Sequence, residues 1–261
     1  IFDPEGRAPD WWGSARALHA AGVERGDVIL NTFSYHLTPA AFIFEAGAEA
    51  LGCPVIPAGP GNTADQLLAI AHYRPRVYVG VPDFLKILLD KADETGADRS
   101  SLQVGMVTGA ALPESLRAEL FGRGVAVRQC YGTADLGIIA YEDGGPGMVL
   151  NEGVIVEIVR PGTGEPVADG EVGEIVVTRL DADYPLLRFA TGDMSAILTD
   201  AVPGPRTGRR NPGRTRPGSC SRRCRWGCTR ASPDCTRRRC NRRRSGTRNS
   251  AGRPGRTSRR S

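Results

Sequence analysis

The sequence predicts an α/β protein, in which a parallel sheet with flanking helices is followed by a small antiparallel β subdomain and a disordered arginine-rich tail. Short apolar runs alternate with amphipathic segments as far as about residue 130. Beyond Gly137 the apolar runs are separated by Gly and Pro clusters, without helical periodicity between them. Alternating strands and helices favour a parallel sheet with right-handed crossovers, whereas turn-separated strands favour antiparallel pairing. We expect three regions, 1–140, 141–200 and 201–261.

The first region should contain five strands and five helices. Asp10 is a suitable cap for the first helix, and Pro39 occupies the first turn of the second, where its missing N–H costs nothing. Thr63 and Gln66 have capping-box spacing. Residues 76–81 are continuously apolar, as in a strand buried on both faces, and 83–95 carry an apolar stripe at helical spacing. We expect strands over 27–34, 54–58, 76–81, 102–108 and 125–130, and helices over 10–25, 39–51, 63–73, 83–95 and 113–121.

The second region should form the antiparallel subdomain. A turn cluster of Gly, Pro and acidic residues occupies 142–147, and a Pro-Gly-Thr-Gly turn occupies 161–164. We expect strands over 154–159, 173–179 and 186–189, because apolar runs divided by such turns are typical of antiparallel sheets.

Composition changes abruptly near residue 200. Residues 201–261 hold 20 arginines and one acid, Asp234, whereas the first 200 residues hold 14 basic and 28 acidic side chains. With Val202 as its only large aliphatic residue, the tail cannot bury enough apolar surface to fold. Three interpretations remain open: a shifted reading frame in a GC-rich coding sequence, an arm that binds nucleic acid, and a zinc site. The five tail cysteines include no C-x2-C pair, which disfavours zinc.

Cysteine usage and hydropathy bear on the compartment. Only Cys53 and Cys130 precede the tail, which favours a reducing cytosol without disulfide bonds. No apolar run approaches the roughly 18 to 20 residues that span a bilayer, and the N-terminus lacks the pattern of a signal peptide. We therefore expect a cytoplasmic protein without a membrane partner.

Three motifs carry a resemblance to a known family. Residues 28–61 are similar to the phenylacetate-coenzyme A ligase family, Tyr131 to Asp135 (YGTAD) resembles the Tyr-Gly-x-Thr/Ser-Glu element of adenylate-forming (ANL) enzymes, and Arg188 to Asp193 (RFATGD) resembles their Arg-x-x-Thr-Gly-Asp motif. Three motifs in the family's order, over about residues 1–200, are more specific than any one alone. The resemblance implies part of the large domain of an enzyme that activates an aryl or related carboxylic acid with ATP and Mg²⁺, then transfers the acyl group to coenzyme A.

The resemblance also implies roles for individual residues. Asp135 stands where the family has its Mg²⁺-associated Glu, and Asp193 stands where a carboxylate accepts hydrogen bonds from both ribose hydroxyls. For both residues, the alternative is a turn residue without a ligand. His36 could orient the substrate carboxylate, or be a structural residue. The expected nucleotide site comprises Gly109, Ala110, Ala111, Tyr131, Gly132, Thr133, Ala134, Arg188 and Asp193, the metal ligand is Asp135, and the acyl pocket is bordered by Phe33, Tyr35 and His36.

The sequence departs from the family pattern at several points. Asp135 is one carbon shorter than Glu, so its charge reaches about 1.5 Å less far. Ala134 replaces a phosphate-contacting hydroxyl, and Thr133 would point elsewhere on an extended chain. Neither the upstream phosphate loop nor the lid domain with its catalytic lysine is found, so we expect these 261 residues to bind nucleotide or acid weakly at most.

Two other activities remain open besides acyl-coenzyme A formation. A nucleic-acid-binding protein would act through the arginine tail, with binding that weakens as salt rises. An adenylating enzyme of another kind would pass the acyl group to a protein thiol. The motifs leave the acid, the acceptor and the oligomeric state open.

Overall fold

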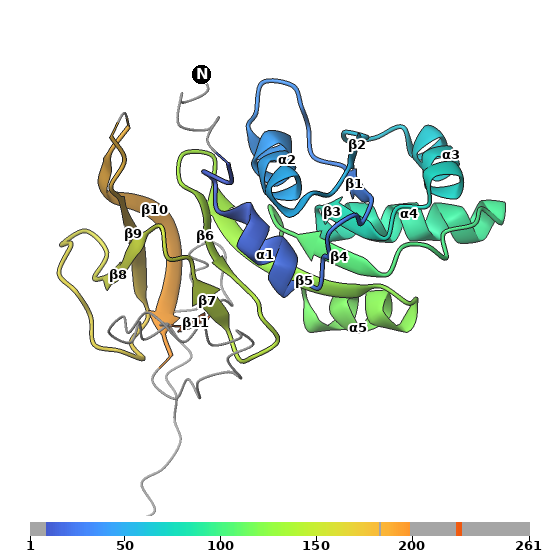
Figure 1. Cartoon of the computed structure of the whole chain (residues 1–261). Coiled ribbons are helices and arrows are strands. Elements are labelled where there is room, and N and C mark those ends of the chain that lie inside the picture. The colour runs from blue at the N-terminus through green and yellow to red at the C-terminus, as the bar shows by residue number, and fades with distance from the viewer. Residues whose placement is uncertain (1–8, 183, 199–222, 226–261) are drawn as a thin grey trace, which may run out of the picture. The chain divides into compact units, whose positions relative to one another are not determined.

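The computed structural model describes residues 9–182, 184–198 and 223–225 (Figure 1). They all lie within one compact unit, Ile1–Arg230. The described strands form one hydrogen-bonded sheet in the order β2-β1-β3-β4-β5-β6-β7-β11-β10-β9-β8. The predictions about the arginine tail fall almost entirely outside the described residues, and they stay predictions.

The first half of the sheet is parallel, as predicted. Its strands are β1 (Ile29–Asn31), β2 (Val55–Pro57), β3 (Val77–Gly80), β4 (Val104–Val107) and β5 (Ala126–Thr133). After β2 the chain crosses to the other side of β1, so the strand order reverses between β1 and β3. Such a reversal opens a crevice at the carboxyl ends of the strands, where open α/β sheets bind ligands.

Five helices cover the two faces of this parallel part (Figure 1). They are α1 (Ser14–Ala20), α2 (Ala40–Leu51), α3 (Thr63–Tyr73), α4 (Pro82–Thr95) and α5 (Glu114–Gly122). Alternate strand residues supply two separate cores. Ile29 joins the core under α1 and α2, whereas its neighbour Leu30 joins the core under α3, α4 and α5.

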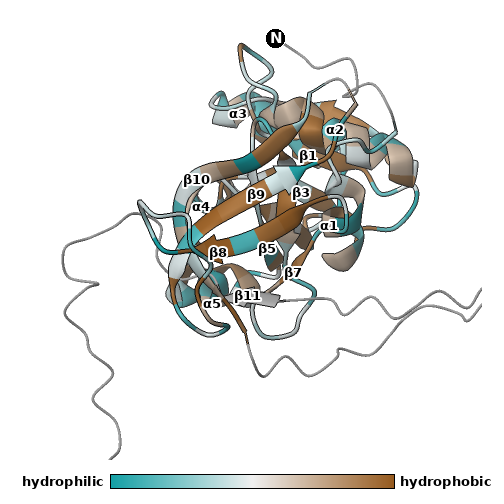
Figure 2. Ribbon diagram, turned by 90° about the vertical axis from the view of Figure 1, so that its left-hand side faces the viewer, coloured by the Kyte–Doolittle hydropathy of each residue, from teal (hydrophilic) through white to brown (hydrophobic). Residues whose placement is uncertain are grey.

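The second half of the sheet is antiparallel from β5 onward. Its strands are β6 (Gly137–Tyr141), β7 (Met148–Leu150), β8 (Ile155–Val159), β9 (Gly173–Arg179), β10 (Leu186–Ile197) and β11 (Arg223–Arg225). A third core lies here, and it includes Leu136, Ile139, Ile175 and Val177. In Figure 2, β9 is mainly hydrophobic, whereas hydrophobic and hydrophilic stretches follow one another along β10.

Several predicted boundaries were wrong. The first helix runs only from Ser14 to Ala20, because positive-φ glycines at 22 and 26 turn the chain after it. The two short strands β6 and β7 were missed, and β10 extends to Ile197 rather than ending at 189. Among the described residues, no helix has both the length and the apolar character that a membrane crossing requires.

The predicted capping box at Thr63 and Gln66 does not form. Thr63 is already the first helical residue, and the preceding cap residue, Asn62, makes no side-chain capping bond. Gln66 is buried, and its Nε2 donates instead to the carbonyl oxygens of Gly59 and Gly61 at 2.8 and 2.7 Å. The glutamine thus ties the loop after β2 to α3.

Candidate functional site

A pocket of about 220 Å³ opens at the carboxyl edge of the parallel strands. The loop after β1 and the first turns of α2 form one wall, the end of β4 forms a second, and the β5–β6 hairpin forms a third. It adjoins the reversal of strand order, where a ligand site was expected. The lining residues are Phe33, Thr38, Pro39, Ala40, Ile43, Phe44, Thr108, Gly109, Gly132, Thr133, Ala134, Gly137 and Ile138.

The wall from β1 and α2 is aromatic. Phe33 stacks on Phe44 with ring centroids 5.4 Å apart and planes 10° from parallel. Such a pair presents flat apolar surface on which another ring packs favourably. Of the three predicted acyl-pocket residues, only Phe33 lines the pocket. Tyr35 lies outside the lining, in an edge contact with Phe42 at 5.2 Å, and His36 is exposed.

A buried asparagine at the end of β1 holds this wall in place. The Nδ2 of Asn31 donates to the Tyr35 hydroxyl at 3.2 Å and to the Ala41 carbonyl at 2.9 Å, while its Oδ1 accepts from the Phe33 amide at 3.2 Å. Burial, with the nearby Glu45 carboxylate, raises the pKa of Tyr35 to about 12. Asn31 was not among the predicted site residues, although a polar residue that ends an apolar strand was a usable signal.

The hairpin between β5 and β6 carries the Tyr-Gly-Thr-Ala-Asp motif. Gly132 is required here, because a Cβ at this position would lie 2.4 Å from the carbonyl oxygen of Gly137. The hydroxyl of Thr133 accepts from the Leu136 amide at 3.1 Å and closes the turn. Asp135 is exposed in this turn. Its place in the fold is therefore that of a turn residue, which was the predicted alternative to a metal ligand.

The described residues contain no cluster of three or more His, Cys, Asp or Glu side chains that could enclose a metal ion. Mg²⁺ does not need such a cluster, because it binds through one or two carboxylates together with water and substrate phosphates. Asp135 therefore fits Mg²⁺ as a single protein ligand beside a polyphosphate, and does not fit a site built from protein groups alone.

Two of the predicted nucleotide-site residues meet on the antiparallel side. The Tyr131 hydroxyl donates to Asp193 Oδ2 at 2.7 Å, which joins β5 to β10 across 62 residues of sequence. Burial, reinforced by the Asp193 carboxylate, raises the pKa of Tyr131 well above its ordinary value. The phenol therefore remains a hydrogen-bond donor at neutral pH.

The other predicted nucleotide residues are spread more widely. Gly109 lines the pocket, whereas Ala110 and Ala111 are exposed in the connection between β4 and α5. Arg188 is exposed, with Nε 3.1 Å from Glu157 Oε2 and a 2.7 Å bond to the Gly164 carbonyl oxygen. Its partners thus belong to the β8–β10 region rather than to the pocket.

Cys130 has no nucleophilic character, although it lies next to the motif. It is 4% exposed, and burial raises the pKa of its thiol to about 12. A thiol in that environment stays protonated and unreactive at neutral pH.

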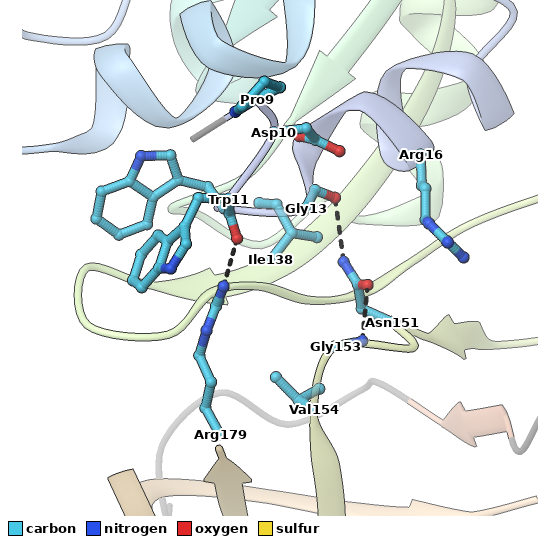
Figure 3. A pocket seen from close by; sticks show the side chains of 11 residues that line it. Pro9, Asp10, Trp11, Gly13, Arg16, Ile138, Asn151, Gly153, Val154 and Arg179 are labelled. Atoms are coloured by element: carbon cyan, nitrogen blue, oxygen red, sulfur yellow. Dashed lines mark hydrogen bonds between the residues drawn. The ribbon is translucent and has the colours of Figure 1, made fainter. Parts of the chain in front are cut away.

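A second pocket, of about 260 Å³, lies between the start of α1 and the antiparallel strands (Figure 3). Arg179 is its main polar residue: it donates to the carbonyl oxygen of Leu136 at 2.6 Å and to that of Trp11, and its guanidinium lies 3.8 Å from the Trp11 ring centroid. On the opposite side of the pocket, Asn151 Nδ2 donates to the Gly13 carbonyl oxygen at 3.1 Å. These bonds join the segment before α1 to the antiparallel strands.

Comparison with known proteins connects this arrangement to a family. The AMP-binding enzyme family matches residues 12–180. Phenylacetate-coenzyme A ligases from Aromatoleum evansii and Thermus thermophilus are 30% and 31% identical to the chain, each over 202 residues. Those matches cover 72% and 74% of this chain but 46% and 45% of the relatives. The chain therefore spans about half the length of these curated relatives.

Solved structures share the fold. A crystal structure of 2-hydroxyisobutyryl-CoA ligase in complex with 2-HIB-AMP and CoA matches with a TM-score of 0.70 at 21% identity, over 77% of this chain and 46% of that chain. The anthranilate CoA ligase in complex with anthranoyl-AMP matches with a TM-score of 0.56 at 19% identity, over 73% of this chain and 42% of that one. The predicted fold class is confirmed. With its family match across more than half its length, the chain belongs to the AMP-binding enzymes, as a relative of the phenylacetate-coenzyme A ligases.

Proposed function

We propose that this chain supplies the acyl pocket and the ribose-binding edge of an acid–coenzyme A ligase that acts on an aryl or related carboxylic acid. One observation carries the proposal: the aromatic pocket and the Tyr131–Asp193 pair meet on a single strand, β5. An acyl group in the pocket and a nucleoside at Asp193 would therefore flank the same strand end. That is the arrangement an acyl-adenylate needs.

The reaction would proceed in two steps. A carboxylate oxygen attacks the α-phosphorus of ATP, which forms the acyl–phosphate bond and releases pyrophosphate. The coenzyme A thiolate then attacks the acyl carbon, which forms the thioester and releases AMP. Mg²⁺, when bound through the ATP phosphates and Asp135, would neutralise charge that builds up on the leaving pyrophosphate. The chain spans about half the length of its relatives, so this complete reaction is proposed for the whole protein.

Pocket chemistry favours an aryl acid over a polar one. Phe33 and Phe44 supply stacked ring surface, and Ile43, Ile138 and Ala134 line the remaining space with apolar groups. No Lys or Arg belongs to the described lining of this pocket. A ring would thus be bound by packing, and the substrate's carboxylate would lie toward the hairpin.

Calorimetric titration with a non-hydrolysable phenylacetyl-sulfamoyl adenosine tests the proposal. We expect the wild-type chain to bind this analogue more tightly than AMP, because the analogue fills both the pocket and the ribose edge. Phe33→Ala should weaken binding of the analogue by about tenfold, the effect of losing one buried aromatic contact, and should leave AMP binding unchanged.

The matched control is Phe121→Ala, which removes a 71% exposed phenylalanine from α5. It should leave both affinities unchanged. An analogue affinity that Phe33→Ala does not reduce would show that the proposed pocket is not the acyl site, and a wild-type chain that binds neither ligand would overturn the proposed function as a whole.

A further inference from the structure

The segment around Asp193 departs from regular sheet geometry. Ala190 pairs with Val176 and Met194 pairs with Glu174, so three residues of β10 (191–193) face the single residue Ile175 on β9. Gly192 adopts a φ of +77°, which allows the extra residues to bulge outward. The Asp193 carboxylate therefore leaves the regular alternation of the strand.

Two anchors fix this bulge, and they act on different parts of Asp193. The Thr191 hydroxyl donates to the Ile175 carbonyl at 3.0 Å and accepts from the Asp193 amide at 3.3 Å, which holds the backbone. The Tyr131 hydroxyl binds Oδ2 of the carboxylate at 2.7 Å. At that length, a hydroxyl-to-carboxylate bond is charge-assisted and strongly directional.

We propose that Tyr131 is a positioning residue, whose hydroxyl orients the Asp193 carboxylate toward the two ribose hydroxyls of the nucleotide. A carboxylate rotates about its last torsion, and an unrestrained one would lose that freedom on binding. The Tyr131 bond uses one lone pair of Oδ2, which leaves Oδ1 and the second lone pair of Oδ2 for a vicinal diol. This inference rests on the proposed function, and adds to it a role for the phenol oxygen.

Tyr131→Phe removes only that oxygen and keeps the ring. We expect the AMP affinity of this variant to fall about fivefold to tenfold, because a carboxylate that the phenol no longer restrains loses its rotational freedom when the nucleotide binds. Its affinity for 2′,3′-dideoxy-AMP should change less than twofold, because that ligand offers Asp193 no hydroxyls. In an Asp193→Ala background, the effect of Tyr131→Phe on AMP should disappear, since the carboxylate that the phenol orients is then absent.

Calorimetry with AMP and 2′,3′-dideoxy-AMP measures all four proteins of this cycle, and thermal melting confirms that each is folded. Tyr141→Phe is the matched control: it removes a hydroxyl from a half-buried tyrosine on β6, and should leave both affinities unchanged. If Tyr131→Phe does not fold, Tyr131→Met takes its place in the cycle, because it also lacks the hydroxyl and should lose the same preference for AMP over the dideoxy ligand.

The outcomes separate two failures. If Tyr131→Phe reduces the affinities for AMP and for 2′,3′-dideoxy-AMP equally, Tyr131 acts through something other than orienting Asp193. If it reduces neither affinity, the Asp193 carboxylate needs no orientation. Both results overturn the inference and leave nucleotide binding by the wild-type chain intact. A wild-type chain that binds no AMP would instead overturn the proposed function, and this inference with it.

Discussion

Replacing Arg179 with Met should destabilise the chain severely, although the residue belongs to none of the predicted motifs. Its side chain is only 13% exposed. It donates to the carbonyl oxygens of Leu136 and Trp11 and stacks over the Trp11 ring (Figure 3). Its Nε also pairs with the Asp181 carboxylate at 3.3 Å, and the Asp181 side chain is only 6% exposed. Each buried carbonyl left without a donor costs about 1 to 3 kcal/mol, and the lost cation–π contact about 0.5 to 2 kcal/mol. Because Met keeps most of the packing, we expect a loss of about 3 to 5 kcal/mol.

Urea denaturation followed by tryptophan fluorescence and circular dichroism measures this loss. Arg188→Met is the matched control, since that arginine is also next to the β9–β10 hairpin but its side chain is 52% exposed and paired with Glu157. Exposed pairs contribute about 0 to 1 kcal/mol, so the control should stay near wild type. A loss below about 1 kcal/mol for Arg179→Met, or equal losses for both variants, would refute the anchoring role.

Three further predictions concern the two sides of the site. Asn31→Ala should lower the free energy of unfolding by about 1 to 3 kcal/mol. It should also weaken binding of the aryl-adenylate analogue, because the loop that carries Phe33 is no longer held. An unchanged affinity for the analogue in a calorimetric titration would contradict this. Burial raises the pKa of Cys130 to about 12, so the folded chain keeps a proton that the unfolded chain releases above about pH 9. The contribution of the Cys130 thiol to stability is therefore complete below pH 9 and is lost toward pH 12. Above pH 9 the unfolding free energy of Cys130→Ala should fall with pH less steeply than that of wild type, by up to about 1.4 kcal/mol per pH unit. Parallel pH profiles for the two proteins would argue against a raised pKa at Cys130. Ala134→Thr restores a hydroxyl at the hairpin, and should tighten ATP binding about threefold to tenfold without affecting adenosine, a difference that calorimetry would detect or exclude.

The sequence predicted the parallel half of the sheet well, for a physical reason. A strand covered by helices on both faces is apolar throughout, so residues such as Val77 to Gly80 stand out from the amphipathic helices beside them. The two missed strands are apolar as well, but they are short and lie between turns. β7 has only three residues, and the Gly-Pro cluster between β6 and β7 gives a loop signal in the sequence although the two strands pair.

The site was predicted in part, because motifs identify strand ends but not what packs around them. Tyr35 and His36 follow the correct strand, yet Asn31 binds the Tyr35 hydroxyl and His36 faces solvent, so neither lines the pocket. Phe44 does line it, although a helical phenylalanine looks like ordinary core in sequence. Arg179 contacts the Trp11 carbonyl across 168 residues, a relation that no local pattern encodes.

Strand β5 joins the proposed acyl site to the proposed ribose site. It pairs in parallel with β4 and antiparallel with β6, so it belongs to both halves of the sheet. Its side chains alternate between faces: Cys130 belongs to the core under α1 and α2, and Tyr131 packs against the core of the antiparallel half. Gly132, one residue further, borders the aromatic pocket. Consecutive residues of one strand thus contact the proposed ribose and acyl sites, so a single peptide link sets their spacing, at the point where the pairing of β5 with β6 shifts register.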